Sequence, residues 1–160
     1  MPKKIISADS GDSMEILKIK KLREDAKVPN RATSGSAGLD LCACIDEPIT
    51  LKKGDKAIIP TGIAIGLDDP HYAAFIYARS GLACKRGLAP ANKVGVVDCD
   101  YRGEVTVALH NHSSEPQTVA VGERVAQMVI APYYTADFEL CDELSDTVRG
   151  EGGFGSTGRK

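Results

Sequence analysis

The chain has 160 residues, with 20 Lys and Arg against 22 Asp and Glu, which gives a formal net charge of −2. This length is typical of one domain, and 42% hydrophobic residues are enough to bury a core, which excludes a disordered polymer. The near-neutral charge excludes a basic surface for duplex DNA or RNA, and the sequence has no apolar run of the ~18 residues that a membrane span needs. Without a signal-peptide pattern near Met1, we expect an intracellular protein, cytoplasmic or, in a eukaryote, nuclear, that binds neither nucleic acid nor membrane.

The predicted elements are mainly short strands separated by turns. Residues 1–13 are polar and aperiodic, which indicates a loose N-terminal extension. Runs with strand-like periodicity cover residues 16–19, 58–67, 72–77, 105–110, 119–121 and 125–130, and a turn is predicted at 53–55. The ~8–12-residue spacing of the turns is typical of an all-β sandwich or barrel.

One segment is predicted to be helical. Ser80 is placed to cap residues 81–86, and Gly87 is placed to end the helix in the left-handed conformation. A hydroxyl and free backbone N–H groups at a helix N-terminus, with Arg79 beside them, form a site for a phosphate oxygen. An ordinary capped helix with a surface Arg explains the same residues, so this segment alone leaves both interpretations open.

Residues 95–104 form an acidic segment between apolar strands. A calcium loop is excluded, because the fifth and twelfth positions of that template hold Arg102 and Leu109. The segment instead predicts an acidic hairpin with Tyr101 at its tip. Asp98 could act there as a general base and Tyr101 could pack against a ligand ring, and a solvated turn is the alternative.

Two polar residues, Gln127 and Asp40, stand next to apolar or small residues in the sequence. Gln127 sits within the apolar segment 122–130, where a buried amide needs partners in the core or in a ligand. Asp40 follows a turn of small residues at 36–39 and enters a strand, a position that most often belongs to a turn-forming Asp.

Cysteine and histidine suggest no separate chemistry. The five Cys are an odd number without a secretory signal, which argues against a disulfide framework, and no pair has zinc-finger spacing. His110 and His112 would share one face of a strand and could ligate a metal. We interpret them as solvent-facing, because no third ligand is near in sequence.

The C-terminal tail has an unusual composition, with Gly at five of the last eleven positions. It lacks the ending of a P-loop and would pass for a flexible linker. However, a lone Phe154 stands between glycines, with Arg149 before it and Ser156 and Thr157 after it. Such a set can fold over a nucleotide, with Phe on the base and Arg and hydroxyls on the phosphates. We therefore predict a flexible tail after about residue 147 that acts as a lid.

Taken together and in this order, the five segments resemble the five motifs of the trimeric dUTPase family, whose members hydrolyse dUTP to dUMP and pyrophosphate. The resemblance runs from about residue 37 to residue 158, and Gly-Gly-Phe-Gly-Ser-Thr-Gly is its most specific part. It implies an all-β subunit, a distorted jelly-roll-like β-barrel with one short helix and a flexible C-terminal tail, assembled as a homotrimer. The implied organisation is an extension at 1–13, a β domain at 14–147 and a Gly-rich tail at 148–160 that closes over an active site shared between subunits.

The resemblance also implies a role for individual residues. Asp98 would activate a water for attack on the α-phosphorus, and Tyr101 would pack beneath the deoxyribose and exclude UTP. Asn92 would contact uracil, together with backbone groups of Val96 and Val97. Such an enzyme limits uracil incorporation into DNA and supplies dUMP for thymidylate synthesis.

The remaining implied contacts concern the phosphates and a metal ion. Phe154 would stack on uracil, and phosphate contacts are implied for Arg79, Ser80, Gly81, Gln127, Arg149, Gly155, Ser156 and Thr157. The implied cofactor is Mg²⁺, held mainly by the triphosphate, with Asp40 touching a water on the ion. Arg124 is expected to brace the subunit interface instead.

Two alternatives and one departure accompany the resemblance. A dCTP deaminase of the same fold would need a Glu on the strand at 105–110, which has no carboxylate and carries Ala108 at about that place. A non-catalytic nucleotide-binding regulator would not need Asp98 or the tail. The motif around Arg79 usually begins with Pro and here begins with Ala78.

Overall fold

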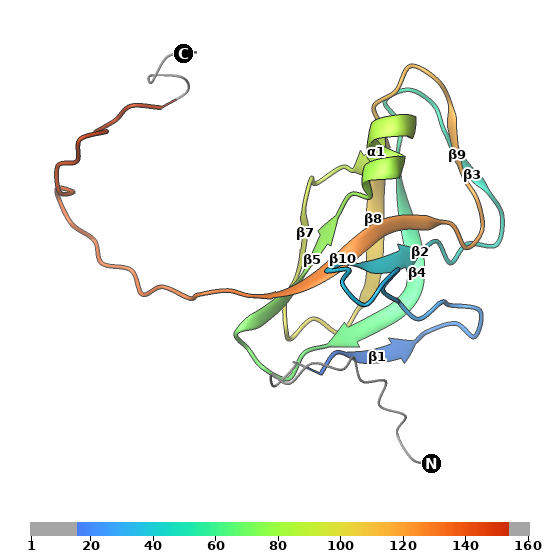
Figure 1. Cartoon of the computed structure of the whole chain (residues 1–160), viewed down its shortest axis with the longest axis horizontal. Coiled ribbons are helices and arrows are strands. Elements are labelled where there is room, and N and C mark those ends of the chain that lie inside the picture. Colours follow the sequence, from blue (N-terminus) through green and yellow to red (C-terminus); the bar gives the residue numbers. More distant parts are fainter. Residues whose placement is uncertain (1–15, 154–160) are drawn as a thin grey trace.

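The computed structural model of the chain describes residues 16–153 (Figure 1). Within that range it contains ten strands and one short helix. These are β1 (Lys18–Lys21), β2 (Leu39–Cys42), β3 (Ile49–Leu51), β4 (Lys56–Gly66), β5 (Tyr72–Tyr77), α1 (Ser80–Arg86), β6 (Leu88–Pro90), β7 (Gly95–Val97), β8 (Glu104–Asn111), β9 (Gln117–Val119) and β10 (Arg124–Pro132). The all-β prediction with one short helix is confirmed. No helix in the described range is long and apolar enough to cross a membrane.

The strands form two four-stranded sheets and one two-stranded ribbon. The first sheet has the order β1-β4-β8-β6, the second has the order β2-β10-β5-β7, and β3 pairs with β9. All the pairings are antiparallel. The non-consecutive order means that segments distant in sequence are neighbours in both sheets, as Figure 1 shows for β2 and β10.

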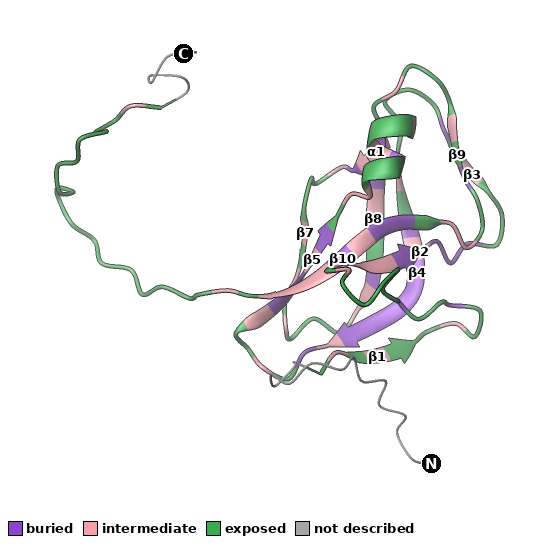
Figure 2. Ribbon diagram, viewed as in Figure 1, coloured by how far each residue is buried: buried purple, intermediate pink, exposed green. Residues whose placement is uncertain are grey.

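One hydrophobic core lies between the two sheets. Each sheet contributes side chains that are almost completely buried: Ile59, Ile63, Leu88, Val105, Val107 and Leu109 from the first, and Leu41, Ala74, Ile76, Val125, Ala126 and Met128 from the second. Strand β8 shows why the sequence folds this way, since every second residue points inward, as its apolar alternation predicts. Figure 2 shows this buried interior, and it also shows that the chain after β10 is largely exposed.

Strand β4 contains a bulge between Pro60 and Ala64. The register with β8 changes between Pro60 and Ala64, so that extra residues of β4 lie opposite β8. Gly62 adopts φ +70° there, and a Cβ at this position would come within 2.6 Å of the Cys44 Sγ and 2.7 Å of the Ala26 Cβ. Only glycine satisfies both the conformation and the space.

Strand boundaries differ from the sequence prediction at several points. Strand β1 begins at Lys18, two residues later than predicted, because its pairing with β4 starts at Lys18 opposite Gly66. The run predicted at 119–121 is displaced, since β9 covers Gln117–Val119 and a turn follows. The turn at 53–55 is confirmed, with the Asp55 carboxylate accepting a hydrogen bond from the Lys52 N–H.

Asn111 is completely buried and joins three segments. Its side-chain amide donates to the Leu51 carbonyl at 2.9 Å and the Glu115 carbonyl at 2.8 Å, and its Oδ1 accepts from the Ser113 N–H and hydroxyl at 2.9 and 2.7 Å. We predict that Asn111→Leu lowers the free energy of unfolding by about 3 kcal/mol, because buried carbonyls lose their donors.

Chemical denaturation of the two variants Asn111→Leu and Asn30→Leu tests this prediction. Asn30 is exposed, so the same substitution there should change the free energy of unfolding by no more than about 0.5 kcal/mol. Equal losses for the two variants would contradict the role given to Asn111.

Candidate active site

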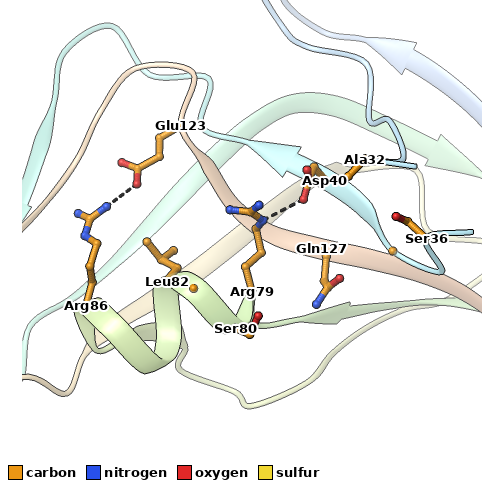
Figure 3. A pocket seen from close by; sticks show the side chains of 11 residues that line it. Ala32, Ser36, Asp40, Arg79, Ser80, Leu82, Arg86, Glu123 and Gln127 are labelled. Carbon is orange, nitrogen blue, oxygen red and sulfur yellow. Dashed lines mark hydrogen bonds and ion pairs between the residues drawn. The ribbon is translucent and has the colours of Figure 1, made fainter. Parts of the chain in front are cut away.

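A polar hollow of about 360 Å³ lies at the N-terminus of α1, against β2 and β10 (Figure 3). We call it the Arg79 pocket. It is lined by Ala32, Ser36, Gly38, Asp40, Arg79, Ser80, Gly81, Leu82, Arg86, Glu123 and Gln127. Five of these were predicted site residues, and the fold brings them together from segments distant in sequence.

Asp40 organises the cations of the Arg79 pocket. Its Oδ1 accepts a hydrogen bond from Arg79 Nε at 2.9 Å, and its Oδ2 accepts one from Arg124 Nη1 at 3.0 Å (Figure 3 shows the pair with Arg79). The Asp40 side chain is only 13% exposed, so solvent screens these pairs less than surface pairs. Two guanidinium groups against one carboxylate leave a net positive charge, which favours an anion.

Gln127 connects the same pocket to the end of β5. Its Nε2 donates to the Ala78 carbonyl at 2.9 Å. Its Oε1 lies so close to Gly38 that a Cβ there would come within 2.4 Å. Gly38 therefore makes room for Gln127, which both holds the residue before Arg79 and lines the pocket.

The helix α1 begins one residue earlier than predicted. Ser80 is its first residue, and the N-cap is Arg79, which has extended backbone and makes no side-chain capping hydrogen bond. The prediction that Ser80 is the cap was wrong, because Arg79 has extended backbone and its carbonyl already accepts a hydrogen bond from the Ala83 N–H. The predicted end is confirmed, since Gly87 has φ +66°.

Sequence reasoning missed Arg86 and Glu123, which close the far side of the Arg79 pocket. The Arg86 Nη1 pairs with the Glu123 Oε1, and its Nε donates to the Gln117 Oε1 at 3.1 Å. The other Glu123 oxygen accepts the Ala120 N–H at 2.9 Å. Arg86 therefore braces α1 against the turn before β10 (Figure 3). Its only sequence signal was a cation in the last helical turn.

A second hollow, of about 220 Å³, lies between β5, β6, β7 and β8. We call it the Tyr101 pocket. It is lined by Ile76, Pro90, Asn92, Gly95, Val96, Val97, Asp98, Tyr101, Glu104, Val105, Thr106, Val107 and Ala108. Five predicted site residues lie together here, and among the described residues none lines both pockets.

The predicted hairpin at 95–104 is wrong. Strand β7 pairs with β5, whereas β8 pairs with β4 and β6, so residues 98–103 cross from one sheet to the other. The apolar runs on both sides of this segment look like hairpin partners in sequence. However, β7 pairs with β5 and leaves Val96 exposed, whereas every second residue of β8 is buried in the core.

The crossing loop is closed by its own hydrogen bonds. The Tyr101 N–H donates to the Asp98 carbonyl at 3.1 Å, and the Tyr101 hydroxyl donates to the Glu104 carbonyl at 3.1 Å. Arg102 Nη1 donates to the Cys99 carbonyl at 2.6 Å and the Tyr101 carbonyl at 2.9 Å. Asp98 is thereby held at the rim of the Tyr101 pocket as an exposed residue.

The tail is only partly described. Arg149 is exposed, donates to the Gly152 carbonyl at 2.7 Å and lines neither pocket. In Figure 1 the chain after β10 runs away from the sheets. Phe154, Gly155, Ser156 and Thr157 lie outside the described residues.

No Cys or His is among the residues that line the two pockets. Burial raises the pKa of the thiols of Cys42 and Cys44, which keeps both protonated at neutral pH. Within residues 16–153 no three His, Cys, Asp or Glu side chains form a group that could hold a metal ion. The rings of His110 and His112 lie 6.3 Å apart, centre to centre.

Comparison with known proteins identifies the family. The dUTPase family model matches residues 24–158. The deoxyuridine 5'-triphosphate nucleotidohydrolase of Hahella chejuensis is 52% identical over 141 residues, covering 88% of this chain and 93% of the relative. That of Neisseria meningitidis is 55% identical over 131 residues, covering 82% of this chain and 87% of the relative.

Solved structures agree with the sequence relatives. A mutant dUTPase of phage 80alpha has a TM-score of 0.79 at 26% identity, covering 88% of this chain and 98% of the phage chain. Another mutant of the Staphylococcus bacteriophage 80alpha dUTPase, solved with dUpNHpp, has a TM-score of 0.76 at 27% identity, covering 89% and 98%. The predicted jelly-roll-like barrel is thereby confirmed. Since the family model spans most of the chain and the relatives are about half identical over nearly their whole length, this chain belongs to the dUTPase family.

Proposed function

We propose that this protein hydrolyses dUTP to dUMP and pyrophosphate, and thereby limits uracil incorporation into DNA and supplies dUMP for thymidylate synthesis. The observation that carries the proposal is the Tyr101 pocket, which gathers Asn92, Asp98 and Tyr101 around one hollow. For a nucleotide substrate, this set would supply a base contact, a general base and a surface for the sugar, and membership of the dUTPase family supports that substrate.

Five residues of the Tyr101 pocket have a place in the reaction. Asn92 and the backbone of Val96 and Val97 hold uracil, and Tyr101 lies beneath the deoxyribose. Asp98 accepts a proton from a water whose oxygen attacks the α-phosphorus. The bond from that phosphorus to the bridging oxygen breaks, and pyrophosphate leaves. Such chemistry depends mainly on placement and on neutralised charge.

In the same reaction the Arg79 pocket binds the phosphates of the substrate. Arg79, Ser80, Gly81 and Gln127 present a guanidinium group, a hydroxyl, backbone N–H groups and an amide in one hollow. Asp40 fixes Arg79 through its Nε and leaves the outer nitrogens of the guanidinium for phosphate oxygens, apart from the 3.4 Å contact of Nη1 with the Arg124 carbonyl. A charge-assisted contact of this kind suits a polyanion.

Mg²⁺ is the proposed cofactor, and the residues present fit it. When bound, the ion would neutralise charge on the triphosphate. Mg²⁺ commonly keeps several waters and takes its ligands largely from substrate phosphates, so it needs no all-protein cage. Both oxygens of Asp40 are already engaged by arginines, which argues against direct ligation, so Asp40 would touch the ion through a water.

We also propose a homotrimer whose active sites are shared. The two pockets share no lining residue among those described, and the chain after β10 leaves the body of its own subunit. Both observations support a site in which the Tyr101 pocket, the Arg79 pocket and the tail come from different subunits. The Arg124 side chain pairs with Asp40 at 3.0 Å within one subunit, and its bracing of a subunit interface stays a prediction.

Incubation with dUTP, dCTP and UTP in the presence of Mg²⁺ tests the function. Pyrophosphate should form from dUTP, at a kcat/KM at least about 100-fold above that for UTP, and no ammonia should form from dCTP. Residues 105–110 of β8 carry no carboxylate, and Ala108 lines the pocket at the place where a deaminase would need one, which supports this result. Glu104 at the start of β8 also lines the pocket, but its Oε1 accepts the Gly62 N–H. Ammonia from dCTP would instead identify a deaminase, and binding without turnover would identify a regulator.

A further inference from the structure

The ring of Tyr101 lies directly across Gly103. A Cβ added at Gly103 would come within 2.3 Å of the Tyr101 hydroxyl oxygen and 2.5 Å of the Cζ, far below any tolerated contact. Gly103 is not among the described glycines with positive φ, so its backbone does not demand glycine. The space that it leaves is filled by the ring.

The tip of the same ring is held by the first residue of β8. The Tyr101 hydroxyl donates to the Glu104 carbonyl at 3.1 Å. Glu104 is itself fixed, because its side-chain Oε1 accepts the Gly62 N–H in the bulge of β4 at 2.7 Å. The Thr61 hydroxyl fastens the same bulge to the Val105 carbonyl. The ring is therefore attached through Glu104 to a rigid, buried part of the barrel.

The position of the ring matters because Tyr101 forms part of the wall of its pocket. The residue is 46% exposed, so much of it remains available to a ligand. Rejecting a nucleotide for one extra hydroxyl requires a surface that does not yield. A displacement of about 1 Å is enough to weaken a contact of this kind.

We propose that Gly103 and Glu104 are positioning residues that set the discrimination between deoxyribose and ribose, Gly103 by giving the Tyr101 ring its place and Glu104 by anchoring its hydroxyl. The inference rests on the proposed function, in which Tyr101 packs beneath the sugar. Neither residue needs to touch the substrate, since both act through the ring.

The first test is Gly103→Ala, assayed with dUTP and UTP. The ratio of the two kcat/KM values should fall at least about tenfold, mainly through a higher KM for dUTP, while kcat for dUTP stays within about threefold. Gly35→Ala is the matched control, because a Cβ at Gly35 meets no atom within 4 Å. If the wild type hydrolyses dUTP selectively and Gly103→Ala leaves the dUTP-to-UTP ratio of kcat/KM unchanged, the inference is overturned but the proposed function is not. A wild type that does not hydrolyse dUTP instead overturns the proposed function.

A double-mutant cycle separates positioning from a general structural effect. In a Tyr101→Ala background, Gly103→Ala should not change the dUTP-to-UTP ratio further, because no ring remains to be displaced. Effects that add independently would overturn the role given to Gly103.

Glu104 is tested by two substitutions. Glu104→Gln keeps an oxygen that can accept the Gly62 N–H and should retain the selectivity, whereas Glu104→Ala should lower it at least about fivefold. Thermal unfolding shows whether each variant is folded. A Gln variant as unselective as the Ala variant, or an Ala variant as selective as the wild type, would overturn the anchoring role.

Discussion

Replacing Asp98 by Asn should lower kcat for dUTP by about 10²–10⁴-fold, the usual contribution of a general base. Asn has nearly the same shape but cannot accept a proton from water at neutral pH. Binding should survive, because the base, sugar and phosphate contacts come from other residues of the two pockets. Pyrophosphate release measures turnover, and calorimetry with dUpNHpp measures the Kd, which should change by no more than about threefold.

Asp100→Asn is the matched control for this experiment. Asp100 lies two residues away in the same loop, is exposed and does not line the Tyr101 pocket. Its substitution removes the same charge and should leave kcat within about twofold. Equal losses for the two variants would indicate a long-range effect of charge, and undiminished turnover in Asp98→Asn would remove Asp98 from the mechanism.

The sequence predicted those parts of the fold that depend on local rules. Alternation in β8 predicted its inward residues, and Gly87 predicted the end of α1. The hairpin at 95–104 was wrong because strand pairing is non-local, with β7 paired to residues 74–76. The predicted start of α1 was wrong by one residue, because Arg79 has extended backbone and its carbonyl accepts the Ala83 N–H, so Arg79 takes the cap position that the capping preference assigns to Ser80.

For the candidate site too, the sequence predicted some features and missed others. The order of motifs predicted which residues gather, but not that they form two pockets in one chain. Arg86 and Glu123 lie 37 residues apart and meet only because α1 packs beside the turn before β10. The contact between Tyr101 and Gly103 was equally invisible, since a turn glycine and a space-making glycine look the same in sequence.

Deleting residues 148–160 should lower kcat/KM for dUTP at least about 100-fold, because the deletion removes the Arg149 guanidinium and the predicted lid. The melting temperature should hardly change. The hydrogen bonds described for residues 148–153 are local, joining Arg149 to Gly152 and Thr147 to Gly150, so the deletion removes no described hydrogen bond to the barrel. Deleting residues 1–13 is the control and should leave kcat/KM within about twofold, since no motif falls in that segment.

Mixing two inactive variants then decides which subunit the tail serves. Chains with Asp98→Asn keep their tails, and chains lacking residues 148–160 keep Asp98. If each active site combines the Asp98 of one subunit with the tail of another, mixed trimers contain sites with both parts, and a substantial fraction of wild-type turnover should return. If each tail closes over its own subunit, no site in the mixture is complete, and turnover stays at the level of the separate variants. The chain after β10 runs away from the sheets of its own subunit, which favours restoration.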